Sequence, residues 1–129
     1  KLAEAEFLYL NGNDLGGTIP PELLSVGAVP RLRELHLGGN RLTGTLPPSS
    51  DSGEGGLALS QLYLEDNLLT GSLPPSWGDD MYDLRRLYVG RNRIGGTVPA
   101  YEWSAGMEEL RELRLGENVL TGEVPSELE

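Results

Sequence analysis

One phrase recurs five times along the chain and restricts its fold more than any other feature. It reads apolar-x-x-apolar-x-apolar-x-x-Asn and ends at Asn13, Asn40, Asn67, Asn92 and Asn118. The intervals between successive asparagines are 27, 27, 25 and 26 residues. Intervals of roughly 20 to 29 residues are typical of stacked repeat units, each of which buries its apolar face against its neighbours. We therefore predict a solenoid of about five coils, which offers surfaces rather than one deep pocket.

A second element follows each asparagine, and Leu42-Thr43-Gly44-Thr45-Leu46-Pro47 is one example. Together the two elements resemble the plant-type leucine-rich repeat, with its pattern LxxLxLxxNxLxGxIP. The resemblance implies one α/β-type solenoid domain over residues 1–129, a right-handed coil with a parallel sheet on its concave face. Loops and short 3-10 or helical turns would form the convex face. The repeats are predicted at about 1–27, 28–54, 55–80, 81–105 and 106–129.

The residue types in the phrase explain why such a coil folds. Alternating leucines are the period-2 signal of a short strand with one buried face. The asparagine follows the strand, where its amide can both donate to and accept from backbone groups that would otherwise lack partners. We predict this structural role for Asn13, Asn40, Asn67, Asn92 and Asn118.

Glycine and tryptophan occupy fixed or nearly fixed phases of the repeat. A glycine stands four residues after every asparagine, where we predict a bend that a Cβ would hinder. Trp77 occupies the position of a family leucine and Trp103 lies one residue past it. We interpret both indoles as core residues rather than as binding residues.

Composition excludes several classes of function. The chain has no cysteine, one histidine, and no phosphate-loop, zinc-protease or nucleophile-elbow motif. We predict that it is not an enzyme and has no metal site and no cofactor. The net charge of −10 argues against nucleic acid and anionic membranes as partners. No apolar run approaches the roughly 18 residues of a membrane span, so we predict no direct insertion into a membrane.

The outward positions of the predicted strands suggest a binding surface. The column between the two central leucines reads Tyr9, His36, Tyr63, Tyr88, Arg114, and Tyr and Arg are enriched in binding hot spots. Neighbouring columns add Phe7, Arg86 and Arg91. Six of the ten bases and six of the twenty acids lie in the sheet phrases, which leaves the rest of the surface acidic. The alternative is that the tyrosines serve only strand pairing and that His36 is merely a solvated strand residue.

Three functions are compatible with this pattern. The resemblance favours a non-catalytic scaffold that binds a protein or peptide partner through its concave sheet. A second hypothesis is an assembly subunit that associates through its end coils, alone or within a larger complex. Joining the last residue to the first would space Asn118 and Asn13 by 24 residues, which is a repeat-like interval. A third is a carbohydrate-binding protein whose tyrosines stack on sugar rings.

The sequence says less about the parent protein of this chain and about its cellular compartment. We expect it to be a segment of a longer array of similar repeats. The family resemblance allows an extracellular protein, and the lack of cysteine and of Asn-x-Ser/Thr sequons leaves an intracellular location open.

Overall fold

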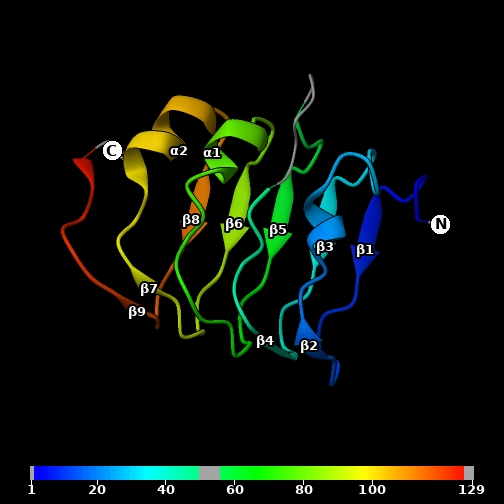
Figure 1. The fold of residues 1–129 in the computed structure, drawn as a ribbon, viewed down its shortest axis with the longest axis horizontal. Helices are drawn as coiled ribbons and strands as arrows, with labels where there is room; N and C mark the ends of the chain where they lie inside the picture. Colours follow the sequence, from blue (N-terminus) through cyan, green and yellow to red (C-terminus); the bar gives the residue numbers. More distant parts are fainter. Residues whose placement is uncertain (1, 50–55, 127–129) are drawn as a thin grey trace.

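The computed structural model describes residues 2–49 and 56–126, and it confirms the predicted solenoid. Five short strands form one parallel sheet in the order β1-β3-β5-β6-β8, and they lie side by side in Figure 1. We number the coils 1 to 5 after these strands, which are β1 (Phe7–Tyr9), β3 (Glu34–His36), β5 (Gln61–Tyr63), β6 (Arg86–Tyr88) and β8 (Glu112–Arg114). The limits assigned to the repeats stay a prediction, because a continuous coil has no break between repeats.

The register of the main sheet follows the repeat. Leu8, Leu35, Leu62, Leu87 and Leu113 pair in sequence from coil to coil. The central members of this row are fully buried, and the apolar residues three positions before and two positions after them in the phrase join them in a single apolar core. Side chains alternate between the two faces of a strand, so the residues on either side of this row project outward.

Short strands follow the asparagines at the edge where the main strands end (Figure 1), and isolated bridges at Thr70 and Ser72 continue this pairing through coil 3. β2 (Gly16–Thr18) pairs with β4 (Arg41–Thr43), and β7 (Gly95–Gly96) pairs with β9 (Val119–Leu120). The glycine four residues after each asparagine has a positive φ, between 74° and 89°. At Gly44 an added Cβ would also lie 2.8 Å from Thr18 Cγ2. The bend predicted for these glycines is therefore confirmed.

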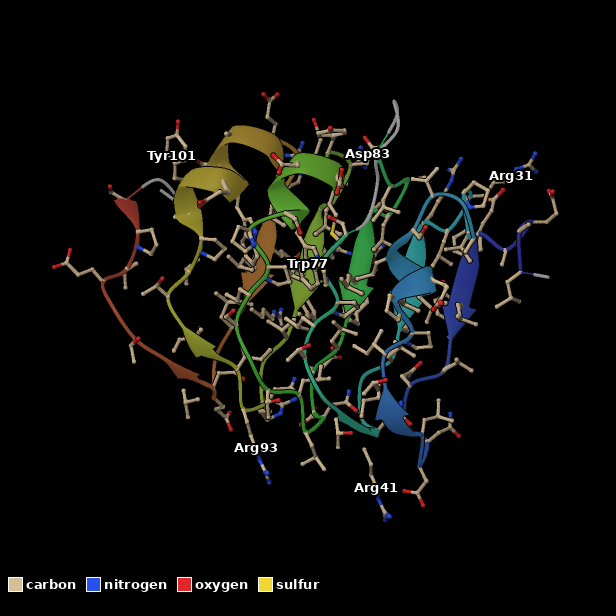
Figure 2. The ribbon with its side chains drawn as sticks, viewed as in Figure 1. Arg31, Arg41, Trp77, Asp83, Arg93 and Tyr101 are labelled. Carbon is tan, nitrogen blue, oxygen red and sulfur yellow. The ribbon has the colours of Figure 1, made fainter. Side chains whose placement is uncertain are left out.

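The convex side carries three short helical segments, η1 (Pro21–Leu24), α1 (Trp77–Asp80) and α2 (Ala100–Gly106). The latter two lie next to each other in Figure 1. Trp77 points into the molecule (Figure 2) and is 0% exposed, while Trp103 is 1% exposed. Their rings are parallel within 9°, and each indole N–H donates to a proline carbonyl of the preceding coil. The predicted core role of both indoles is confirmed. No helix in the described part of the chain is long and apolar enough to cross a membrane.

The asparagines form a hydrogen-bonded ladder along the coils. Asn67 Nδ2 donates to the carbonyls of Leu37 and Leu64 at 3.0 and 3.1 Å, and its Oδ1 accepts from the amide of Leu42 at 2.9 Å. Asn40, Asn92 and Asn118 repeat this pattern. Asn13, in the first coil, is exposed and bonds only within its own turn. The contacts of Asn40, Asn67, Asn92 and Asn118 join neighbouring coils through the backbone, whereas Asn13 makes no such link among the described residues.

A candidate binding surface on the main sheet

The outward residues of the strands form a continuous column of four rings and one guanidinium, which we call the aromatic column: Tyr9, His36, Tyr63, Tyr88 and Arg114. Its members touch in sequence. The ring of His36 lies 4.5 Å from that of Tyr9 and 4.2 Å from that of Tyr63, and the Tyr63 and Tyr88 rings are 4.7 Å apart at 87°. Arg114 Cζ lies 4.4 Å from the centre of the Tyr88 ring, a cation–π contact. The predicted column is confirmed as a geometric feature.

A parallel column anchors the tyrosine hydroxyls, and we call it the polar column: Glu34, Gln61, Arg86 and Glu112. Tyr9 Oη donates to Glu34 Oε2 at 2.6 Å, Tyr63 Oη donates to Gln61 Oε1 at 2.7 Å, and Tyr88 Oη donates to Glu112 Oε2. Links within the column join Gln61 to Glu34, and Arg86 to both Gln61 and Glu112. The rings are thus held at their sides by neighbouring rings and at their tips by hydrogen bonds.

These hydrogen bonds influence the ionisation of the groups involved. The carboxylate of Glu34 accepts the hydroxyl proton of Tyr9 and raises the pKa of that tyrosine. The hydrogen bond from Tyr88 lowers the pKa of Glu112, and the same bond raises the pKa of Tyr88. Tyr9 and Tyr88 therefore stay protonated donors, and Glu112 stays a charged acceptor, at neutral pH.

His36 lies in the middle of the aromatic column and has few polar contacts. Its Nε2 is 3.3 Å from Glu34 Oε2, but this contact lacks the angle of a hydrogen bond and the nitrogen is otherwise buried. The imidazole therefore serves the surface mainly as a ring between two tyrosines. His36 is a half-buried strand residue whose ring is packed between those of Tyr9 and Tyr63.

A depression opens beside the aromatic column in coils 3 to 5, and we call it the glycine-floored pocket. Its volume is about 290 Å³, and Gly90 and Gly116 contribute backbone but no side chain to it. Tyr88, Arg114, Arg91, Glu117 and Glu65 line the rest. The equivalent glycine in coil 2, Gly38, is covered, because the Glu65 carboxyl lies where its Cβ would be, with Cδ at 2.8 Å. The pocket therefore exists where two successive coils place glycine on the sheet face and no neighbour covers it.

The rim of the pocket is built from unusual backbone. Asp66, Arg91 and Glu117 have φ values of 56°, 52° and 58°, whereas coils 1 and 2 have glycine at this position. A residue with a Cβ is strained in this left-handed region. Arg91 binds Asp66 through two hydrogen bonds of 2.5 and 2.6 Å, which lowers the pKa of Asp66. The strained positions thus carry charged side chains to the edge of the pocket.

The structure brings all eight predicted surface residues onto one face. Phe7 is 51% exposed at the first strand and lies beside Tyr9, with 6.3 Å between the ring centres. Arg86 lies within the polar column, whereas Arg91 and Arg114 line the pocket. Sequence reasoning did not assign roles to Glu34, Gln61 and Glu112, nor to Glu65 and Glu117. A signal was present, because two outward glycines in consecutive coils leave a gap in any such surface. Within residues 2–49 and 56–126, no group of three or more His, Asp or Glu could hold a metal ion.

Comparison with known proteins agrees with this architecture. A family model described as Leucine Rich Repeat matches residues 5–26, 31–52 and 58–79. A comparison with curated protein sequences gives no significant match. Among solved structures, the BIR3–SERK2 complex from Arabidopsis thaliana is similar, with 33% identity over 90% of this chain and a TM-score of 0.70. The BIR2 ectodomain from the same plant shares 30% identity over 93% of the chain, with a TM-score of 0.81.

A third structure, the Arabidopsis receptor kinase HAESA in complex with the peptide hormone IDA and the co-receptor SERK1, is 28% identical over 98% of the chain, with a TM-score of 0.81. The chain spans 56% and 58% of the first two matched chains and 20% of the HAESA chain. Each segment that the family model matches contains one strand of the main sheet and the asparagine that follows it. The chain belongs to the leucine-rich-repeat family, in its plant-type form.

Proposed function

We propose that the chain is a non-catalytic interaction module that binds a protein or peptide partner along the aromatic column and the adjoining pocket. The observation that carries this proposal is the anchoring of the tyrosines. Their hydroxyls are bonded to the polar column and their rings are packed edge to face. Ordering a mobile side chain on binding costs about 0.5 to 1.5 kcal/mol, and here that ordering has already occurred on folding.

The similar structures support the same class of function. One of them contains BIR3 with SERK2, and another contains HAESA with a peptide hormone and a co-receptor. These partners belong to those proteins. What this chain shares with them is the solenoid and its main sheet, on which the aromatic column is built.

The anchoring also weakens the carbohydrate alternative. A sugar ring stacks on the flat face of an aromatic side chain, so it needs that face to be free. The Tyr88 ring has Arg114 over it, and the Tyr9 and Tyr63 rings each adjoin the His36 ring. An extended peptide can instead use ring edges and the charged groups beside them. Association through the end coils stays a hypothesis, and it becomes an outcome of the following test.

The test is a selection of random peptides displayed on phage against the immobilised chain. Clones that bind are then compared on Y63A/Y88A and on the matched control Y82A/Y101A. Tyr82 and Tyr101 are exposed tyrosines, and Tyr101 lies on α2 at the helical edge of the molecule (Figure 2). Removing two hot-spot tyrosines should weaken binding at least about 30-fold by calorimetry, since each contributes about 1 kcal/mol or more. Peptides that bind the wild type and Y63A/Y88A equally well would reject the proposal.

A companion measurement addresses assembly and sugars. Sedimentation of wild type and Y63A/Y88A over a range of concentrations reports on self-association, and a glycan array reports on carbohydrate binding. Concentration-dependent association that the double substitution leaves unchanged would instead support end-coil contacts. Glycan binding lost in Y63A/Y88A would support the carbohydrate hypothesis.

A further inference from the structure

Gln61, the only glutamine of the chain, lies in the middle coil and within the polar column. It pairs in register with Glu34 of coil 2 on one side and with Arg86 of coil 4 on the other. Its Nε2 donates to Glu34 Oε1 at 3.0 Å, and its Oε1 accepts from Tyr63 Oη at 2.7 Å and from Arg86 Nη1 at 3.4 Å. Both ends of the amide are therefore occupied within the sheet surface.

The two neighbours make opposite demands on the side chain between them. Both carboxyl oxygens of Glu34 accept hydrogen bonds, whereas the Arg86 guanidinium can only donate them. An amide has a donor group and an acceptor atom, so it satisfies both neighbours at once. A carboxylate at this position would face Glu34 without a donor, and an ammonium group would face Arg86 without an acceptor. Gln61 is thus the point at which donors and acceptors of the column are matched.

Towards coil 1 the hydrogen bonds reach the hydroxyl of Tyr9. Glu34 accepts from Gln61 with one carboxyl oxygen and from Tyr9 with the other, at 3.0 and 2.6 Å. His36 Nε2 lies 3.3 Å from Glu34 Oε2 but lacks the angle of a hydrogen bond. Loss of the Gln61 donor would therefore leave Glu34 Oε1 without a partner among the described residues. The carboxyl that orients Tyr9 could then rotate.

Towards coil 5 the hydrogen bonds reach the hydroxyl of Tyr88. Arg86 Nε donates to Glu112 Oε1 at 3.2 Å, and the Tyr88 hydroxyl donates to Glu112 Oε2. Arg86 is thereby held between Gln61 and Glu112. Loss of the Gln61 acceptor would release one end of Arg86 and leave the Tyr63 hydroxyl without its partner. The effect should be direct on Tyr63 and weaker on Tyr88, which is two residues further along the network.

We propose that Gln61 is the positioning residue of the binding surface, because its amide is the junction that orients the tyrosines on both sides of it. The ring contacts of the aromatic column keep neighbouring rings together, whereas Gln61 determines where their hydroxyl tips are held. It acts on a partner through the rings that it holds in place. This inference rests on the proposed function, since the orientation of the rings matters to a partner that binds them.

Opposite charges at position 61 should disturb opposite ends of the surface. Q61E keeps an acceptor for the Tyr63 hydroxyl but has no donor for Glu34, so the aromatic NMR signals of Tyr9 should shift most. Q61K keeps a donor for Glu34 but has no acceptor, so the signals of Tyr63 should shift most. The exposed tyrosines outside the column, Tyr82 and Tyr101, are internal controls. Their signals should stay in place in both variants and so verify that the fold is intact.

Acid should repair Q61E, which a purely space-filling role would not predict. A protonated carboxyl has a donor and an acceptor, as the amide does. The introduced carboxyl adjoins Glu34, so it should take up a proton above the ordinary glutamate pKa of about 4.3. The Tyr9 signals should therefore return towards their wild-type positions as the pH falls from about 7 to about 5. The wild type, titrated alongside, accounts for any shift caused by His36 next to Glu34, and Arg86 keeps its charge throughout.

Peptide binding then connects this position to function. Peptides selected against the wild type are measured on Q61M, whose side chain is neutral and of similar length but has no donor and only a weakly accepting sulfur. Their Kd should rise about fivefold, the factor expected when a released side chain must be ordered on binding. E102M makes the same kind of change at an exposed residue of α2 and should leave the Kd unchanged.

Two NMR results would overturn the inference. Tyrosine signals that move in the same way in Q61E and Q61K would mean that Gln61 only fills space. Tyrosine signals that stay in place in Q61M would mean that ring contacts alone orient the tyrosines. Unchanged peptide binding by Q61M, together with its loss in Y63A/Y88A, would also reject this inference and leave the proposed function standing. If Y63A/Y88A binds as well as the wild type, the proposed function fails, and the spectra of the free chain still decide whether Gln61 orients the tyrosines.

Discussion

Coils 1 and 2 and coils 3 to 5 share one backbone but differ in what they place on it. In coils 1 and 2 the left-handed position before the asparagine is glycine, whereas in coils 3 to 5 it is Asp66, Arg91 or Glu117. The convex side of coil 1 packs through Leu24, whereas coils 3 and 4 use the stacked Trp77 and Trp103. The C-terminal coils thus combine strained, charged positions at the sheet edge with the largest buried side chains. We infer that the stronger packing tolerates the strain that brings charge to the pocket.

The largest expected effect is on the indole stack. W77A should lower the free energy of unfolding by about 4 kcal/mol, because it leaves a cavity in the core and the Pro47 carbonyl without its donor. L24A, its counterpart in coil 1, should cost about 3 kcal/mol. Urea denaturation measures both. If W77A cost less than L24A, the contrast in packing between the two regions would fail.

Replacing an asparagine of the ladder should cost more unfolding free energy in an inner coil than in the first coil. N67A leaves the Leu42 amide and the Leu37 and Leu64 carbonyls without this partner and should cost about 2 kcal/mol. N13A removes only exposed bonds within one turn and should cost less than about 0.5 kcal/mol. Equal losses in thermal or urea unfolding would show that the amides act locally and not between coils.

The strain at the pocket edge can be measured by exchanging residue types. E117G should stabilise the chain by about 1 kcal/mol, since glycine adopts positive φ without the cost of a Cβ. G39A should destabilise it by about the same amount, because Gly39 has a φ of 66°. The added Cβ would lie 3.4 Å from Gly12 N, so backbone strain and not a clash should account for the loss. Loss of stability in E117G would mean that the side chain, and not the backbone, determines this position.

The smallest effect concerns the Asp66–Arg91 pair. Arg91 lowers the pKa of Asp66 in the folded chain, so this pair stabilises the fold above the unfolded-state pKa of Asp66. That contribution is lost as the pH falls through the lower folded-state value. R91Q should raise the pKa of Asp66 towards its usual range, as followed by NMR of the side-chain carboxyl. R93Q is the matched control and should leave this pKa unchanged. An unshifted Asp66 in R91Q would remove the pair as the cause.

Much of the fold could be predicted because the repeat makes local and tertiary order coincide. Leucines at period 2 specify the buried face of a strand, and a constant interval places the same position of every coil in register. The pairing of Tyr9, His36, Tyr63 and Tyr88 follows from those two facts alone. The resemblance predicted short turns on the convex face but did not place α1 or α2, because their few residues are stabilised by the packed indoles rather than by a helical sequence pattern.

The candidate site could be predicted in outline but not in detail. The column of outward residues is a matter of counting, whereas the anchoring of Tyr63 by Gln61 and of Tyr88 by Glu112 depends on rotamers. The pocket required one further fact, that Glu65 covers Gly38 and leaves Gly90 uncovered. A glutamate can lean towards either neighbouring coil, and the letters of the sequence are the same in both cases.

The amino-acid sequence by itself determined the stacking, the register, the buried leucines and the ladder of asparagines, because each depends on spacing along the chain. Only the tertiary structure decided which carboxylates are paired and which are free, because ion pairs between coils depend on side-chain directions. Arg91 turns to Asp66, and Glu65 and Glu117 are left without a base among the described residues.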